Sequence, residues 1–468
     1  MAYMVIEDFS LGMDLRRSVV TASIKSCRLI RNGFVNSGGE IEKRKAIWQD
    51  TSIDLSGTYG LAGYAGQSWV FGPGARPASL HPGIGYQQLV GAEFGRFSDV
   101  DVFNSQFYVV VEKASGGYQH FYNGALVPEA PQSPTAMAHR SKMYALAGNV
   151  VYFSAIDNAT LWTPGASAIG AGFIQLDGQD EGQMQTIGMA AYYDQMAIFG
   201  RASTQLWAMD EDPAQNQLIQ SLSATGLVAY QALARYSNGD VLFLHDSGVR
   251  SLKARDASNA ASVTDIGSPM DDELRALVRA AIIADGAHVV PNSLVPARGI
   301  VEPTTGQFWL VINDKIYVLS LAPSSNIVAW SRWDVGFNLD YVAVANQAIV
   351  FRSGNNYYVY GANIWDVYDA SQLEVVLPMA AANEPATYKQ FTGMDAAIEG
   401  TWTFEVGTDV QNPNTRDLVG TATGATFNMQ NIGLANTGTH IGLRATCTDA
   451  SRARLGNLIV HFNKGETG

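Results

Sequence analysis

The chain has 468 residues, a formal net charge of −13 and only two cysteines. Two cysteines exclude a disulfide framework and a cysteine-based metal cluster, and the acidic balance argues against a protein that grips nucleic acid. Charged residues make up only 16% of the sequence, whereas aromatic residues reach 10% and glycine accounts for 46 positions. This profile favours an all-β chain of short strands joined by tight turns.

Charge is spread unevenly along the chain. Residues 1–50 hold eight basic and six acidic residues, whereas the rest of the chain is acidic. Glu7, Asp8 and Asp14 interrupt the region where the apolar core of a signal peptide would lie. No run approaches the ~18 apolar residues of a membrane-spanning helix. We therefore expect a protein that is made in a cytoplasm and has no membrane span.

The first fifty residues differ in kind from the rest of the chain. Gly38 and Gly39 mark a turn, and the residues on either side are expected to form short strands. We predict that residues 1–50 are an N-terminal docking segment.

From residue 59 to residue 361 one pattern returns: a short apolar run, a turn of Gly, Asn or Asp, and an aromatic-rich run. Each unit is expected to form three strands joined by two tight turns. Its middle strand is almost entirely apolar, which is typical of a strand buried on both faces. Units recur about every 40–47 residues, as propeller blades do. The sequence predicts a β-propeller of six or seven blades over residues 51–361, with a stacked β-sandwich as the alternative. The units span residues 59–72, 100–124, 137–155, 187–210, 231–254, 299–321 and 341–361.

A propeller usually seals its ring by pairing strands from both ends of the repeat region. We therefore expect part of residues 41–72 to pair with residues 341–361.

One helix interrupts the repeats at residues 268–286. Ser268 is expected to cap it, Pro269 fits its first turn and Gly286 can end it. Its apolar face needs a cover, which is either the propeller rim or a neighbouring subunit. That face consists of Leu274, Leu277, Val278, Ala281 and Ile282.

The amino-acid composition changes at about residue 362, after which Thr and Gly become common. Apolar and polar residues alternate clearly in Thr401–Val406 and Ile441–Thr446. Alternation of this kind predicts a separate C-terminal β-sandwich over residues 362–468.

Sequence patterns that carry catalysis are absent: there is no HExxH, CxxC, GxSxG or P-loop. The seven histidines have no metal-ligand spacing. Asp177, Asp180 and Glu181 lack the alternate spacing of a calcium loop. Asp271, Asp272 and Glu273 could mimic a carboxylate cluster, but we expect them to complement a helix dipole. We predict no catalytic residue, no cofactor and no metal site.

Two features of the sequence concern the binding or cleavage of carbohydrate. The run SAIDNATLW at 154–162 is similar to the turn motif of sialidase-like propellers but lacks its glycine, and arginines for a substrate carboxylate are sparse across the blades. Tyr357, Tyr358 and Tyr360 could stack on sugar rings, but on an alternating strand we expect them to pack within a blade. A carbohydrate-binding or glycan-cleaving propeller is the alternative function, and an interaction platform of a host cell is a third.

The order and spacing of four stretches indicate a known family. They are LGMDLRRSVVTA at 11–22, GGEIEKRKAI at 38–47, VYFSAIDNATLWTPG at 151–165, and SATGLVAYQALARYSNGDVLFLHDSGVRSLKA at 223–254. Together they resemble the nozzle, or tail tubular, proteins of short-tailed bacteriophages, whose start has a Gly-x-Asp-x-Arg-Arg pattern.

This resemblance implies a structural, non-enzymatic virion protein in the phage tail, made in the host cytoplasm. The family forms a hexameric tube below a ring-shaped adaptor, with tail fibres or spikes attached nearby. The tube holds genomic DNA in and then conducts it out. An acidic lumen without specific DNA contacts agrees with that task, because phosphate contacts with Lys and Arg would retard passage.

Charged residues crowd the N-terminal segment. They are either a solvated strand edge or a contact with another subunit or the adaptor, where Arg pairs well with carboxylates. The candidate interface residues are Asp14, Arg16, Arg17, Glu40, Lys43 and Arg44.

If the contact exists, replacing Arg16 and Arg17 by Ala should leave the melting temperature of the monomer nearly unchanged. The same change should weaken ring assembly, because an interface ion pair costs about 2–5 kcal/mol when truncated. Thermal melts and sedimentation measure the two effects. Normal assembly of a destabilised monomer would refute an interface role.

Overall fold

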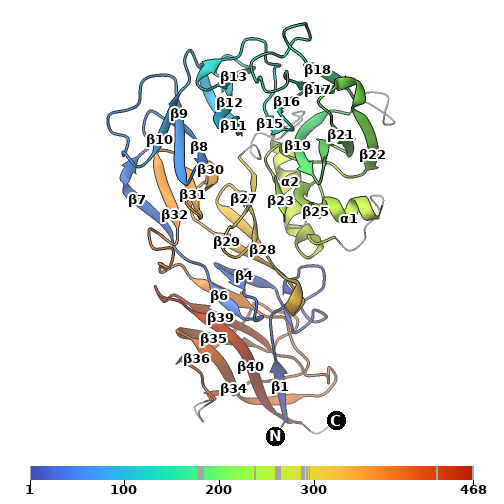
Figure 1. The fold of residues 1–468 in the computed structure, drawn as a ribbon. Helices are drawn as coiled ribbons and strands as arrows, with labels where there is room; N and C mark the ends of the chain where they lie inside the picture. Colours follow the sequence, from blue (N-terminus) through green and yellow to red (C-terminus); the bar gives the residue numbers. More distant parts are fainter. Residues whose placement is uncertain are drawn as a thin grey trace.

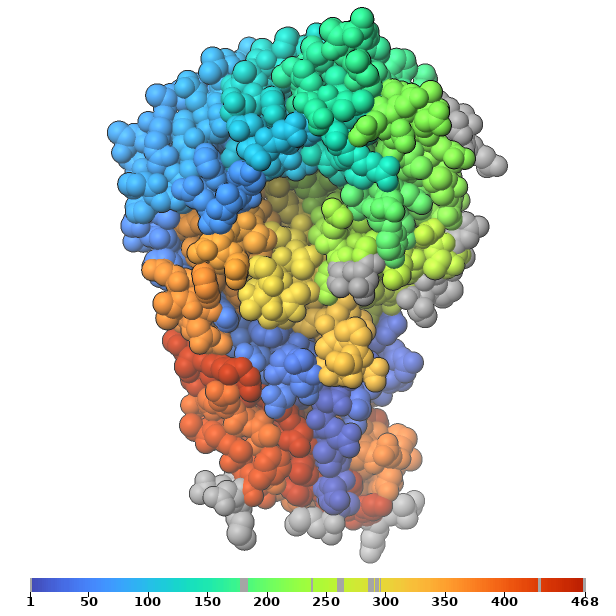
Figure 2. Space-filling model, in the orientation of Figure 1, coloured from blue at the N-terminus to red at the C-terminus, as the bar shows by residue number. Residues whose placement is uncertain are grey.

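The computed structural model of the chain describes residues 2–176, 184–236, 239–258, 265–285, 290, 294, 296–427 and 431–465. Two β-rich parts make up the molecule: a ring of small sheets and a second, narrower domain (Figures 1 and 2). Both chain termini lie at the far end of the second domain (Figure 1).

The ring is a β-propeller, as the repeats predicted. Within the described residues it has six antiparallel blades and a further sheet, β8–β9–β10, whose third strand runs parallel to the second. Each innermost strand lies against the next, and the last lies against the first. The innermost strands are β8 (Tyr59–Tyr64), β11 (Phe94–Phe103), β15 (Ala136–His139), β19 (Thr186–Tyr192), β23 (Leu233–Tyr236), β26 (Arg298–Val301) and β30 (Tyr341–Ala345).

In the blades, the strand next to the innermost one was visible as an apolar run because it is largely buried on both faces, β27 along its whole length. Further strands of the ring lie outward of the innermost ones. They are β9 (Gln67–Gly72), β10 (Gly85–Gln88), β12 (Gln106–Lys113), β13 (Tyr118–Tyr122), β14 (Ala125–Leu126), β16 (Lys142–Ala147), β17 (Val150–Phe153), β18 (Gly172–Gln175), β20 (Gln195–Gly200), β21 (Ser203–Ala208), β22 (Gln217–Ser223), β24 (Asp240–His245), β25 (Gly248–Ser251), β27 (Phe308–Ile312), β28 (Lys315–Ala322), β29 (Ile327–Asp334), β31 (Ala348–Ser353) and β32 (Asn356–Tyr360).

The ring closes where it was expected to close. Strand β7 (Ile47–Asp54) pairs antiparallel with β32, with Ile47 opposite Tyr360 and Asp54 opposite Asn356. A strand from the start of the chain therefore completes the last blade.

The expected helix is present as a 3-10 turn, η3 (Ser268–Met270), followed by α2 (Asp271–Asp285). Its face of Leu274 and Val278 is fully buried and packs in one cluster with Val249 of the neighbouring β25. The propeller of the same chain thus covers the helix. Capping by Ser268 was a wrong prediction, because no side chain caps the turn; Gly286 lies outside the described residues.

Residues 1–50 do not form a separate segment. Their strands are built into the second domain, together with residues 373–464. From the start of the chain come β1 (Ala2–Ile6), β2 (Gly12–Met13), β3 (Ser26–Cys27), β4 (Leu29–Arg31), β5 (Gly33–Val35) and β6 (Ile41–Lys43). From its end come β33 (Leu373–Val376), β34 (Lys389–Glu399), β35 (Thr401–Gly407), β36 (Asp417–Thr423), β37 (Ile432–Gly433), β38 (Thr437–Gly438), β39 (Gly442–Cys447) and β40 (Arg454–Lys464).

Two sheets form this domain. In one, β40 pairs with β1, β6 and β34; in the other, β4 and β33 pair antiparallel beside β39, β35 and β36. The second sheet continues through β29 into a propeller blade, so one sheet runs through both domains.

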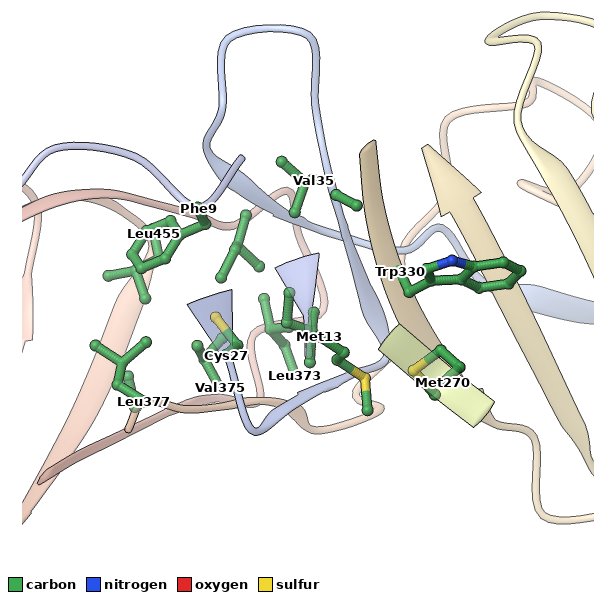
Figure 3. Close-up of a cluster of buried hydrophobic side chains, with 14 of the residues drawn as sticks. Phe9, Met13, Cys27, Val35, Met270, Trp330, Leu373, Val375, Leu377 and Leu455 are labelled. Atoms are coloured by element: carbon green, nitrogen blue, oxygen red, sulfur yellow. The ribbon is translucent and has the colours of Figure 1, made fainter. Parts of the chain in front are cut away.

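A single buried cluster joins the three parts of the chain. Figure 3 shows Met13 and Cys27 from the N-terminal segment, Met270 and Trp330 from the propeller, and Leu373 from the C-terminal part side by side. All five have at most 1% of their surface exposed. The short helix α1 (Leu252–Ala257) follows β25 outside this cluster.

Gly63 of β8 tests the ring closure. A Cβ at this position would lie 1.7 Å from the carbonyl oxygen of Val344 in β30, the last innermost strand. Gly63→Ala should lower the free energy of unfolding by about 3 kcal/mol, because backbone has to move. Gly74→Ala is the matched control, since nothing lies within 4 Å of that Cβ. Equal denaturation midpoints for the two variants would contradict the close approach.

Candidate functional site

The first candidate residues lie at the start of α2. Asp14 is 7% exposed, and its carboxylate accepts hydrogen bonds from Nε and Nη2 of Arg16 at 2.9 and 2.8 Å. Burial would raise the pKa of Asp14, but the bonds from Arg16 outweigh it and lower that pKa. Nη1 of Arg16 also donates to Oγ of Ser268 at 3.3 Å. The Arg17 side chain is exposed.

The second group lies on β6, where the two chain ends meet. Glu42, 8% exposed, accepts from Nε of Arg452 and Nε of Arg454, both at 3.1 Å. Glu40 is more exposed and lies 3.9 Å from Arg454. This carboxylate pair thus joins the N-terminal strand to β40 and the residues before it.

Lys43 and Arg44 are inside the molecule. Lys43 is 0% exposed, donates to the carbonyl oxygen of Asp449 at 2.5 Å, and has its pKa lowered by burial. Arg44 is 4% exposed and donates to the Asp369 carboxylate at 3.1 Å. These two side chains are not available to a partner, contrary to expectation, because β6 is enclosed between β5 and β40. Asp14 is buried too and is used within the chain. Arg17 and Glu40 stay candidates for such a contact, and so does Arg16, but replacing Arg16 also removes the partner of the buried Asp14, so an unchanged melting temperature of the Arg16 and Arg17 double variant is no longer expected.

A further ion-pair ladder crosses the second domain and was not foreseen. Glu374 of β33 accepts from Arg31 of β4 and, at 2.6 Å, from Nε of Arg444. Arg444 in turn pairs with Glu405 at 2.9 Å. Opposite charges on neighbouring strands stabilise a sheet. The only signal in the sequence is that these charges interrupt apolar strands.

Two cavities lie at the centre of the propeller, between the innermost strands. Their volumes are about 330 and 250 Å³. Tyr230 and Arg298 line both. Arg96 and Arg352 also line the larger cavity, so the fold gathers three arginines although basic residues are sparse in the sequence.

The smaller cavity holds two aspartates beside Arg298. Asp99 and Asp101 of β11 line it, and burial raises the pKa of both, that of Asp101 to about 6. Asp99 accepts from Oγ1 of Thr135 at 2.6 Å and from Nε2 of Gln231 at 2.6 Å. The bond from Thr135 ties the β11 blade to the next blade, whereas the bond from Gln231 reaches across the ring to the residues before β23.

Among the described residues no group of three His, Cys, Asp or Glu could hold a metal ion. His120 is 1% exposed between the Tyr108 hydroxyl and the Ser133 carbonyl oxygen, and burial lowers its pKa to about 4. Asp177, Asp180 and Glu181 lie outside the described residues. No helix in the described part of the chain is long and apolar enough to cross a membrane.

The three tyrosines of β32 pack within blades, as predicted. Tyr357 and Tyr358 are 6% and 8% exposed. Tyr360 stacks on Trp333, with ring centroids 5.5 Å apart. Asp271 and Glu273 also have defined partners, since Asp271 pairs with Arg250 at 2.8 Å and Glu273 accepts from the Tyr317 hydroxyl.

No family model and no curated protein matches the chain. Its fold is similar to a chain of a solved structure described as "Crystal Structure of Mitotic Checkpoint Complex", with 11% identity and a TM-score of 0.35, covering 66% of this chain and 92% of that one. It is also similar to the C-terminal WD40 domain of Sif2, with 9% identity and a TM-score of 0.34, covering 56% and 69%. Likenesses at these scores carry no argument about function.

Glu42 and Glu40 offer a matched test of the junction between the chain ends. Glu42→Gln should lower the free energy of unfolding by about 2–3 kcal/mol, because two arginines lose a buried anionic partner. Glu40→Gln should change it by less than about 0.5 kcal/mol, since exposed pairs contribute little. Urea denaturation at neutral pH measures both. Similar losses for the two variants would contradict the assigned role of Glu42.

Proposed function

We propose that the chain is the subunit of a phage tail nozzle: six copies form a ring through which genomic DNA leaves the capsid. The observation that carries the proposal is the set of four stretches that resemble this family, in the family's order, along one chain. The structure supplies a physical reason for the residues in these stretches.

The Gly-x-Asp-x-Arg-Arg start has such a reason at each of three positions. Gly12 has φ +57°, and a Cβ there would lie 2.6 Å from the backbone nitrogen of Trp330, so a side chain does not fit. Asp14 and Arg16 form an ion pair at 2.8 Å. The motif therefore fixes the N-terminal segment against the propeller.

The other stretches also fall on packed elements. Trp162 in the third stretch is 4% exposed and donates from Nε1 to the carbonyl oxygen of Ala159 at 3.0 Å. The fourth stretch, residues 223–254, forms the blade β23–β24–β25 and the start of α1. The resemblance thus rests on residues that shape the fold.

The architecture suits a conduit that bears load. One sheet and one buried cluster run through both domains, so each copy acts as one block. A net charge of −13 per copy favours a lumen that repels DNA phosphates. The partners implied are five further copies, the adaptor ring, and fibres or spikes.

The glycan-binding alternative loses support, because Tyr357 and Tyr358 are buried in the blades and Tyr360 stacks on Trp333. The interaction-platform alternative has no feature of its own in its favour.

Native mass spectrometry of the purified chain, alone and with the adaptor of the same phage, tests the proposal. We expect a species of six 50.3 kDa subunits. Arg17→Glu should weaken ring formation by about tenfold or more, because it reverses an exposed charge at the candidate contact. Arg279→Glu, on the exposed face of α2, is the control and should assemble normally.

A chain that stays monomeric at every concentration, and with adaptor present, would overturn the nozzle assignment. Normal assembly of Arg17→Glu alone would only move the contact elsewhere on the surface.

A further inference from the structure

Arg298 holds an unusual position at the centre of the propeller. It lies on the innermost strand β26, and its guanidinium sits over the ring of Tyr341, 5.3 Å from the centroid. Its Nε atom is buried and has no hydrogen-bond partner among the described residues. The residue as a whole is half-buried, and a buried N–H donor that lacks an acceptor is costly.

The two other arginines of the larger cavity are already engaged. Arg352 is 5% exposed. Its guanidinium donates hydrogen bonds to carbonyl oxygens, among them that of Thr58 at 2.6 Å, and to the Thr58 hydroxyl. Arg96 pairs with Glu112 on the neighbouring strand. Arg352 therefore adds positive charge to the cavity that no bonded carboxylate cancels.

The nearby carboxylates are occupied elsewhere. Asp340 lines the larger cavity, but its Oδ2 atom accepts from the backbone nitrogen of Gly354 at 2.6 Å. Asp99 holds Thr135 and Gln231 on the side of the smaller cavity. Neither forms an ion pair with Arg298 within the described residues. Burial lowers the pKa of Arg298, and the charge of Asp99 partly opposes this shift. Three arginines and one aspartate line the larger cavity, so positive charge is in excess there.

We propose that the 330 Å³ cavity at the propeller axis binds a small organic anion, with Arg298 as the residue that holds its carboxylate or phosphate group. The volume is at the lower end of small-molecule pockets, which suits a ligand about the size of one sugar ring. Arg matches a planar carboxylate or a phosphate with two parallel hydrogen bonds. Tyr59 and Phe97 line the same cavity and supply an apolar wall.

This inference does not depend on the nozzle assignment, because it concerns the interior of a single copy. A carboxylate and a phosphate share the required chemistry, and the experiment separates them.

Isothermal titration calorimetry of the full chain against glucuronate, inorganic phosphate and glucose tests the proposal. We expect glucuronate, phosphate or both to bind with a dissociation constant below about 10 mM, and glucose, which matches glucuronate without its charge, not to bind. Stronger binding of glucuronate identifies a sugar-acid site, and stronger binding of phosphate identifies a phosphate site.

Arg298→Met keeps much of the side-chain volume and should weaken anion binding by about tenfold or more, since the paired hydrogen bonds are lost. Arg298→Lys keeps the charge but not the forked pair of donors. Its affinity for the anion should lie between that of Arg298→Met and that of the unmodified chain. Arg279→Met, far along the surface of α2, should bind as the unmodified chain does. Thermal melts check that each variant folds.

Two results would overturn the assignment: neither anion binds the unmodified chain at about 10 mM, or Arg298→Met binds as tightly as the unmodified chain. If Arg298→Met does not fold, the comparison rests on Arg298→Lys, and undiminished binding by that variant overturns the two-bond geometry on which the site depends.

Discussion

A ring of blades has to join its last sheet to its first, and the rest of this structure depends on how that is done. The chain closes the ring by laying β7 on β32, which also covers strand edges that would otherwise be open. Because β7 begins at Ile47, the residues before it are left outside the ring. The chain leaves the same blade after Tyr360. Both ends therefore meet at one place and build the second domain together.

Ion pairs also join the two ends of the chain. The N-terminal fifty residues have a small basic surplus, and the C-terminal part is acidic. The structure pairs them across the junction, as in Arg31 with Glu374 and Arg44 with Asp369. Glu42 makes the reverse pairing with Arg452 and Arg454. Most charged side chains near residue 43 therefore form ion pairs within the chain. Only the exposed ones are available to a partner.

Much of the propeller could be predicted from the sequence, because its middle strands are apolar throughout and recur at a regular interval. The helix could be predicted because it leaves a local pattern of its own, and the ring closure could be predicted because propellers usually seal their ring with strands from both ends of the repeat region. The second domain could not be assigned fully, because strands of two or three residues such as β2 and β3 are too short to show a period. Arg96, Arg298 and Arg352 are far apart in sequence, and only the closed ring brings them together.

The central claim is that the two chain ends and the propeller form one cooperative body. Hydrogen exchange followed by mass spectrometry tests it directly in the free protein. Backbone amides of β7 that are bonded to β32, and those of β40, should exchange as slowly as those of β27 at the core of a blade, since all three strands open only with global unfolding. Fast exchange of residues 2–54 as a unit, with the propeller still protected, would contradict it.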